Sequence, residues 1–227
     1  QGEQDHYEFT VEESHRVVFD SLTNRVDLNW QLDGPAGQVS NRSFSNTDYS
    51  ATSPAFELTA GQYKLTVDGQ LDAIGDYSLR LIDANTAVEL TPGTNVSATL
   101  DVGTKTAVYK FNATAGNNFY FKAGAASAYA DWRLIDPYGR QEGDPYNLSS
   151  NRDTFAVQRT GEYLLLVEGA VSNTSALSYQ FNLQPVVHST EAMTLDAVTT
   201  ANIDKAGKST NFTFTISETT PVLFDKL

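Results

Sequence analysis

Apolar and polar residues alternate along much of this chain with a period of two. In Tyr7-Glu8-Phe9-Thr10-Val11 every second side chain is apolar, and the segments 63–67 and 77–81 show the same pattern. This period places alternate side chains on opposite faces of a β-strand, so each segment is predicted to be a strand with one buried face. No stretch keeps a helical period, so the pattern predicts an all-β fold. Turns rich in glycine, in two cases with proline, separate the segments at 33–37, 59–62, 136–139 and 159–162.

The pattern occurs twice, at a separation of about a hundred residues. The segment WQLDGPAG at 30–37 returns as WRLIDPYG at 132–139, with Trp, Leu, Pro and Gly in register. A second segment, GQYKLTVDG at 61–69, returns as GEYLLLVEG at 161–169. The opening strand at Tyr7 has counterparts that begin at Tyr109 and at Phe212, so a third copy starts near the end of the chain.

These repeats predict two tandem antiparallel β-sandwich domains of a jelly-roll-like kind, followed by the start of a third repeat. The first sandwich is placed at 1–84, a linker at 85–94, the second sandwich at 95–187, and a linker with the truncated third repeat at 188–227. The second and third copies are preceded by the segments ATLD, at 98–101, and ANID, at 201–204, but nothing similar precedes Tyr7. We therefore interpret the chain as part of a longer array with neighbouring repeats as partners.

The opening strands of the third copy need a partner, because an isolated hairpin is marginally stable in water. Two alternatives are open. The strands dock on the second repeat, or they add to the first repeat of a neighbouring molecule, which lacks strands. The second alternative predicts head-to-tail self-association by strand addition.

The order of the repeated motifs resembles the bacterial pre-peptidase C-terminal domain. The resemblance rests on the Tyr-x-Phe opening strand, the Trp-x-Leu turn with its Pro and Gly, the Gly-x-Tyr-x-Leu-x-Val strand and the closing strand at Tyr77 or Tyr179. It covers both full repeats. It implies a secreted, non-catalytic accessory module that binds insoluble polymers, assists secretion or spaces other domains. Some members are stabilised by calcium through carboxylates near the N-terminal linker, where this chain has Glu3 and Asp5, whereas 103–106 has no carboxylate.

The charge of the chain excludes some partners. The formal net charge is −13 and the calculated isoelectric point is about 4.5, with 15 Lys and Arg residues spread along the chain, so a nucleic-acid partner is not expected.

No apolar run approaches the roughly 20 residues that span a bilayer, so membrane insertion is not expected. The chain has no cysteine. The low charged fraction and the abundant Ser, Thr and Asn are typical of secreted or cell-surface β proteins.

One acidic cluster is a candidate calcium site. Asp68, Asp72 and Asp76 lie on a predicted loop between two strands, and calcium prefers several oxygen ligands. The second repeat has Glu168, Asn173 and Ser175 in the same loop, which is a thinner ligand set. The alternative is a set of solvated loop carboxylates without a metal.

The long turn at 136–147 is a candidate ligand-binding patch. Tyr138, Arg140, Asp144 and Tyr146 could form a polar, aromatic surface of the kind that stacks on sugars. An ordinary long turn is the alternative. Trp30 and Trp132 also suggest sugar stacking, but both stand in alternating strands and are predicted to be core residues.

Catalysis has little support in the sequence. The three histidines, His6, His15 and His188, have no metal-binding spacing, and there is no nucleophile elbow or phosphate loop. We therefore predict a non-catalytic spacer, structural or adhesion module of a large secreted or cell-surface protein. The alternatives are a module that binds a polysaccharide or protein polymer, and the accessory domain of a secreted hydrolase.

The six Asn-x-Ser/Thr triplets leave N-glycosylation open, at Asn41, Asn95, Asn112, Asn147, Asn173 and Asn211.

Overall fold

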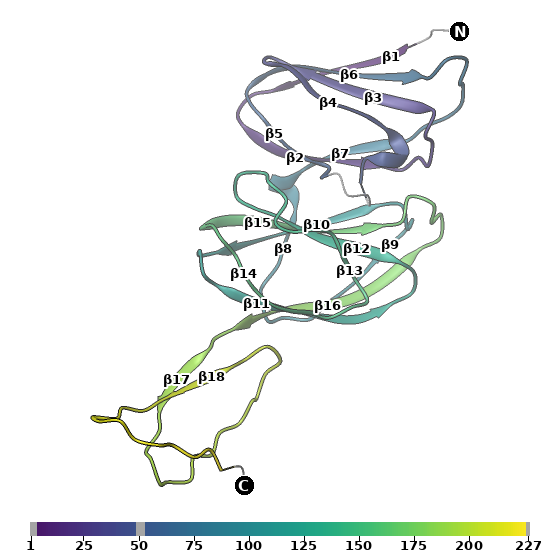
Figure 1. Ribbon diagram of the computed structural model, residues 1–227. Helices are drawn as coiled ribbons and strands as arrows, with labels where there is room; N and C mark the ends of the chain where they lie inside the picture. The colour runs from purple at the N-terminus through teal and green to yellow at the C-terminus, as the bar shows by residue number, and fades with distance from the viewer. Residues whose placement is uncertain (1–3, 49–52, 226–227) are drawn as a thin grey trace.

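The computed structural model describes residues 4–48 and 53–225, and these residues form an all-β structure (Figure 1). The only helical elements among them are two short 3₁₀ turns, η1 (Phe44–Asn46) and η2 (Ala84–Thr86). The predicted fold class is confirmed. Two sandwiches lie one above the other, so four sheets follow one another from the N-terminal end of the molecule (Figure 1). We name these sheets A, B, C and D.

The first repeat consists of sheets A and B. Sheet A has the strand order β1-β6-β3-β4 and sheet B has the order β5-β2-β7. All pairs in both sheets are antiparallel. The strands are β1 (Gln4–Val11), β2 (His15–Ser21), β3 (Leu28–Gly34), β4 (Gly37–Ser43), β5 (Ala55–Leu58), β6 (Gly61–Gly69) and β7 (Leu79–Asp83).

The second repeat consists of sheets C and D and repeats this topology with one more strand in each sheet. Sheet C has the order β13-β12-β15-β10-β8 and sheet D has the order β14-β11-β16-β9. The strands are β8 (Val88–Glu89), β9 (Val96–Leu100), β10 (Thr106–Ala113), β11 (Asn118–Ala126), β12 (Ala130–Ile135), β13 (Tyr146–Asn147), β14 (Arg152–Ala156), β15 (Gly161–Gly169) and β16 (Leu177–Val186).

The register of the central strands is the same in both repeats. In β1 and β6, Phe9 lies opposite Tyr63, and in β10 and β15, Phe111 lies opposite Tyr163. The shared register follows from the shared alternation, because a slip by one residue would turn every apolar side chain to the other face of the sheet.

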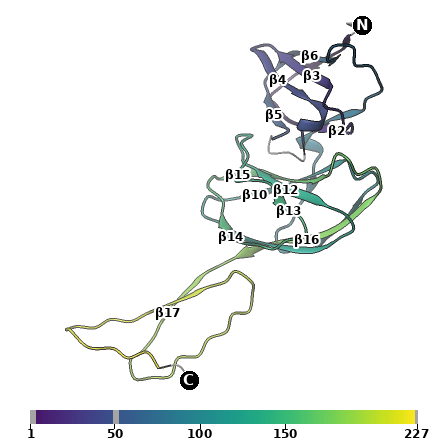
Figure 2. The same cartoon turned by 45° about the vertical axis from the view of Figure 1, so that its right-hand side comes forward.

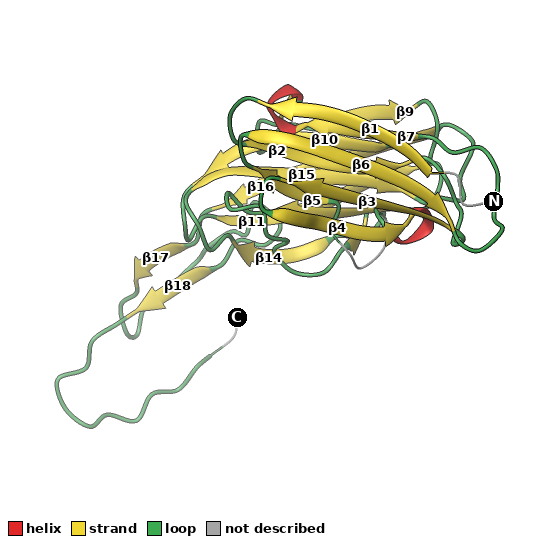
Figure 3. Cartoon of the chain, turned by 90° about the horizontal axis from the view of Figure 1, so that it is seen from above, coloured by secondary structure: helices red, strands yellow, loops and turns green. Residues whose placement is uncertain are grey.

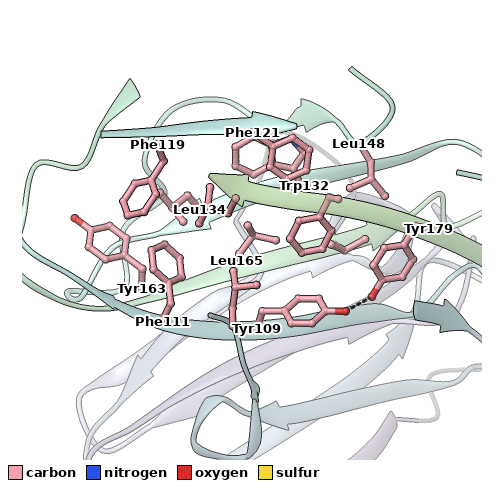
Figure 4. Packing of buried hydrophobic residues seen from close by; sticks show 14 of the residues in the cluster. Tyr109, Phe111, Phe119, Phe121, Trp132, Leu134, Leu148, Tyr163, Leu165 and Tyr179 are labelled. Atoms are coloured by element: carbon pink, nitrogen blue, oxygen red, sulfur yellow. Dashed lines mark hydrogen bonds between the residues drawn. The ribbon is translucent and has the colours of Figure 1, made fainter. Parts of the chain in front are cut away.

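Each sandwich has an aromatic core built on its tryptophan. Trp30 stacks on Phe19 with ring centroids 3.9 Å apart, and Trp132 stacks on Phe121 at 4.2 Å. Both indole side chains are fully buried, as the alternating pattern predicted. Figure 4 shows the core of the second repeat, in which Trp132 and Phe121 lie between the two sheets.

The repeated proline and glycine of the turn motif have a packing role. Gly61 and Gly161 have φ values of +147° and +146°, and a side chain at either position would collide with Pro35 or Pro137 respectively. Positive φ and close approach both favour glycine. This pair of residues therefore recurs because the fold requires it.

The segment predicted as a linker, 85–94, contributes a strand to the second repeat. Strand β8 pairs in parallel with β10, with Val88 opposite Tyr109. The next segment, β9, pairs antiparallel with β16 and closes the other sheet. One edge strand of each sheet of the second repeat, β8 or β9, thus lies in the chain between β7 and β10.

The third copy forms a small unit below the two sandwiches. Strands β17 (Ser189–Ala192) and β18 (Thr210–Thr213) pair in parallel, and the residues between and after them run as loops. This unit projects away from the stacked sandwiches (Figure 2). It touches the second repeat at a turn, where the Thr154 hydroxyl donates a hydrogen bond of 3.1 Å to the Gly207 carbonyl.

Candidate functional site

Sheets B and C pack face to face and join the two repeats. Seen along the stack, the sandwiches overlie one another (Figure 3). One apolar cluster contains residues of both sheets, so the repeats share a hydrophobic contact. Its buried members are Val18, Ala55, Ala84, Val108, Ile135, Leu164 and Leu166, with Ile82 and Ala87 packed against them.

The contact depends on side chains that face away from the core of the second repeat. In β15, Tyr163, Leu165 and Val167 belong to that core. The residues between them, Leu164 and Leu166, point to the opposite face and are fully buried by the first repeat. This strand is therefore buried on both faces, and its sequence has the continuous apolar run that is typical of such strands.

A buried ion pair lies on the same face of sheet C. Arg133 follows Trp132 in β12, and its Nε donates to Glu168 Oε2 at 2.6 Å, with both side chains completely buried. Arg133 Nη1 also donates to Gln141 Oε1 at 2.8 Å. Charged groups removed from water need partners of this kind.

A second polar contact crosses between the repeats directly. Asp20, which is buried in β2, accepts a hydrogen bond of 3.0 Å from the backbone N–H of Thr106 in β10. Arg80 donates to Asp20 Oδ2 at 2.6 Å and to the Thr106 carbonyl at 2.9 Å. One arginine and one aspartate of the first repeat therefore satisfy both backbone groups of Thr106.

The carboxyl group of Asp48 is also perturbed by its place at this interface. Burial raises its pKa well above the ordinary value of 3.8, and the nearby carboxylates of Asp20 and Glu168 raise it further. The Ser21 backbone N–H, which donates to Asp48 Oδ2 at 2.7 Å, acts in the opposite direction. Burial also raises the pKa of Asp20, against the effect of Arg80. Asp48 therefore keeps its proton to a higher pH than an exposed aspartate does.

Arg16 fastens the rim of the interface. Its Nη2 donates to the Pro137 carbonyl at 2.7 Å, and its Nη1 donates to the Glu162 carbonyl at 3.4 Å. Its Nε pairs with Glu57 of the neighbouring strand. The turn at 136–139, one of the motifs of the repeat, is thus a docking point for the first repeat.

The three aspartates of the predicted calcium site are not brought together as a ligand set. Asp68 lies at the end of β6 and accepts a hydrogen bond of 3.0 Å from Gln4, whereas Asp72 and Asp76 are exposed on the following loop. Across residues 4–48 and 53–225, no group of three or more His, Asp or Glu side chains is arranged to hold a metal ion. Calcium binding stays a prediction, and Glu3 lies outside the described residues.

The residues of the predicted ligand patch lie beside different arginines. The exposed ring of Tyr138 is 5.1 Å from the guanidinium of Arg159, and the ring of Tyr146 is 5.9 Å from that of Arg152. The backbone N–H of Arg140 donates to Asp136 Oδ1, which stabilises the turn. Asp144 interacts electrostatically with Arg152. Binding of a sugar or protein polymer at these four residues stays a prediction.

The histidines serve separate local contacts. His6 bonds Thr66, His15 lies beside Asp83, and His188 bonds Ser209. No helix in the part of the chain that the structure describes is long and apolar enough to cross a membrane.

Comparisons with known proteins give no family. No family model matches the chain, and no curated protein matches it. Among solved structures, the Aeromonas hydrophila periplasmic inhibitor of g-type lysozyme is 22% identical over 44% of this chain and 96% of its own, with a TM-score of 0.32. The human MASP-1/3 CUB1-EGF-CUB2 segment is 8% identical over 80% of this chain and 93% of its own, with a TM-score of 0.27. The Clostridium perfringens ZmpB M60 catalytic domain with two CBM51 domains is 10% identical over 80% of this chain and 34% of its own, with a TM-score of 0.25.

Proposed function

We propose that this chain is a non-catalytic β-sandwich module of a secreted or cell-surface protein, and that it acts as a stiff spacer. We further propose that its units are of the pre-peptidase C-terminal type, on the strength of the repeated motifs. The observation that carries the spacer function is the contact between sheets B and C, in which apolar side chains of both repeats form one buried cluster.

Stiffness follows from the nature of this contact. Domains joined only by a linker move relative to each other unless the interface between them is large and hydrophobic. Here the linker segment is itself built into sheet C through β8, and Arg16 and Asp20 add directional hydrogen bonds across the interface. A hinge motion would expose the Arg133 and Glu168 pair to water while breaking these contacts. The two repeats are therefore expected to keep one relative orientation.

The test compares the native chain with an interface variant by small-angle X-ray scattering. Leu164→Lys with Leu166→Thr introduces the residues that the first repeat has at the equivalent positions, Lys64 and Thr66. We expect a larger radius of gyration and a scattering curve that needs several orientations of the repeats. The control, Lys64→Ala with Thr66→Ala on the outer face of sheet A, should scatter like the native chain.

Circular dichroism separates loss of contact from loss of fold in these variants, because the near-ultraviolet signal of the two tryptophan cores persists if each sandwich stays folded. A native scattering curve that itself requires several orientations of the repeats would contradict the spacer proposal. An interface variant that stays folded and scatters like the native chain would also contradict it.

A further inference from the structure

Three buried carboxyl groups lie together where the two repeats touch. Asp20 and Asp48 belong to the first repeat and Glu168 belongs to the second; Asp20 and Glu168 are completely buried, and Asp48 is 2% exposed. The Asp48 carboxyl is in hydrogen-bond contact with that of Asp20 and interacts electrostatically with Glu168. A hydrogen bond between two carboxyl groups requires a proton on one of them. The cluster therefore contains a proton as part of its structure.

Two arginines neutralise two of the three carboxyl groups. Arg80 of β7 pairs with Asp20, and Arg133 of β12 pairs with Glu168. Asp48 forms no ion pair with any charged side chain of residues 4–48 and 53–225. An ionised Asp48 would be a third buried negative charge beside two neutral ion pairs, which is costly. The proton of the cluster therefore belongs to Asp48.

The remaining charged groups of this region lie around Arg133. Half-buried Asp131, on the same strand, and half-buried Arg42 of β4 both interact electrostatically with Arg133. Burial raises the pKa of Asp131 as well, so Asp131 is a second acid of this region that can titrate above the ordinary range. Neither group is among the causes that shift the pKa of Asp48.

The cluster spans the contact between sheets B and C. Asp20 Oδ1 accepts the backbone N–H of Thr106 at 3.0 Å across the contact, and Glu168 lies opposite Thr106 in the pairing of β10 with β15. Separation of the two sheets would therefore divide the cluster and bring water to its carboxyl groups. An acid that is buried in one arrangement and hydrated in another couples its proton to the choice between them.

We propose that the proton of Asp48 controls whether the two repeats keep one relative orientation. While Asp48 is protonated, sheets B and C stay packed. Loss of the proton leaves three carboxylates beside Arg80 and Arg133, and the contact then opens to hydrate Asp48 while each sandwich keeps its own core. This inference rests on the proposed stiff spacer and adds the condition under which the spacer is stiff.

The direction of the pH dependence follows from the position of the proton. In the packed arrangement, burial raises the pKa of Asp48 well above 3.8, and the carboxylates of Asp20 and Glu168 raise it further. In an open arrangement, water brings this pKa back toward its ordinary value. The contribution of Asp48 to packing is therefore complete below pH 3.8 and is lost as the pH rises through the raised pKa. Within this window the ratio of packed to open molecules falls by up to about tenfold per pH unit, since one proton is released.

The test measures the orientation of the repeats with two spin labels, which the absence of native cysteine makes possible. Gln62→Cys and Gln180→Cys place the labels at exposed positions of sheets A and D, on the outer sides of the stack (Figure 1). Double electron–electron resonance is recorded from about pH 4, near the ordinary pKa of aspartate, to about pH 8. We expect one narrow distance at the acid end and an additional broad component toward the neutral end.

Two substitutions in this labelled chain identify the group that titrates. Asp48→Asn should keep the narrow distance at every pH, because a neutral amide replaces the protonated carboxyl and can still donate to Asp20. Asp131→Asn is the matched control, because it removes the other acid of raised pKa from the same region, and it should broaden with pH as the labelled chain does. Near-ultraviolet circular dichroism at each pH shows whether the two tryptophan cores stay folded.

The outcomes separate this inference from the stiff spacer on which it rests. A narrow distance at every pH in the labelled chain would overturn the proton control and leave the spacer standing. Broad distances at every pH, in Asp48→Asn as well, would contradict both. Broadening toward acid, or a response that Asp131→Asn abolishes and Asp48→Asn retains, would overturn the role of Asp48. The scattering comparison of the spacer proposal is accordingly made at the acid end of the range, where packing is complete.

Discussion

The two repeats share their topology, register and core, but they differ on the surfaces that surround the core. The outer face of sheet C carries Leu164 and Leu166, which are buried against the first repeat, whereas the equivalent face of sheet A carries Lys64 and Thr66. The edges also differ, because β8 and β9 cover β10 and β16 in the second repeat, whereas the equivalent β1 and β7 are the last strands of their sheets among the described residues. Side chains that point inward preserve the fold, and side chains that point outward decide what each repeat adheres to.

The buried ion pair is where we expect the largest difference between the repeats. Arg133→Gln introduces the residue found at the equivalent position of the first repeat, Gln31, and leaves Glu168 buried without its arginine. The free energy of unfolding should fall by about 3–5 kcal/mol, as is typical when one member of a buried pair is removed. Gln31→Ala should cost less than about 1 kcal/mol. Urea unfolding followed by tryptophan fluorescence measures both, and similar losses would remove the distinction.

The tyrosine pairs should show a smaller contrast. Tyr109→Phe leaves the buried hydroxyl of Tyr179 without its partner, at a cost of about 1–3 kcal/mol. Tyr7→Phe should cost no more than about 0.5 kcal/mol, because Tyr7 is half exposed and Tyr77 still donates to Asp5 at 2.7 Å. The same urea titration compares them. A Tyr7→Phe variant as unstable as Tyr109→Phe would contradict a cost that depends on the burial of the pair.

The smallest expected effect is a pH dependence of stability that is caused by Asp48 of the first repeat. Folded Asp48 holds its proton above the ordinary pKa of 3.8, so between that pH and its raised pKa the folded state binds more protons than the unfolded state. Stability from this group is present below pH 3.8 and is lost as the pH rises through the window. Asp48→Asn should therefore flatten the decline of the urea midpoint with pH. An unchanged decline of the urea midpoint would assign the pH dependence to another group. Ser150→Asp, at an exposed position of the second repeat, is the control.

The strands and the cores could be predicted from the sequence because they depend on local alternation. Trp30 and Trp132 stand between apolar neighbours two residues away, and this is enough to place them inside. The stacking of the repeats also has a signal in the sequence, namely the unbroken apolar run from Tyr163 to Val167 in place of alternation.

Other features had no local signal. Strand β8 has two residues and pairs with a strand some twenty positions away, so no periodicity distinguishes it from a linker. The spacing of Asp68, Asp72 and Asp76 gave their order along a loop but not the directions of their side chains. The residues Arg133 and Glu168 are 35 positions apart, and their pair lies on the face of sheet C that packs against the first repeat.

The docking of Arg16 on the turn at 136–139 has a practical consequence for labelling. A side chain added at Gly139 would meet Glu57 of the first repeat, so this hairpin has no room for extra residues. The equivalent hairpin of the first repeat ends at Gly37, where an added side chain would meet nothing within 4 Å. An affinity tag or fluorophore inserted beside Gly37 would therefore lie on free surface, whereas the same insertion beside Gly139 would push the two repeats apart.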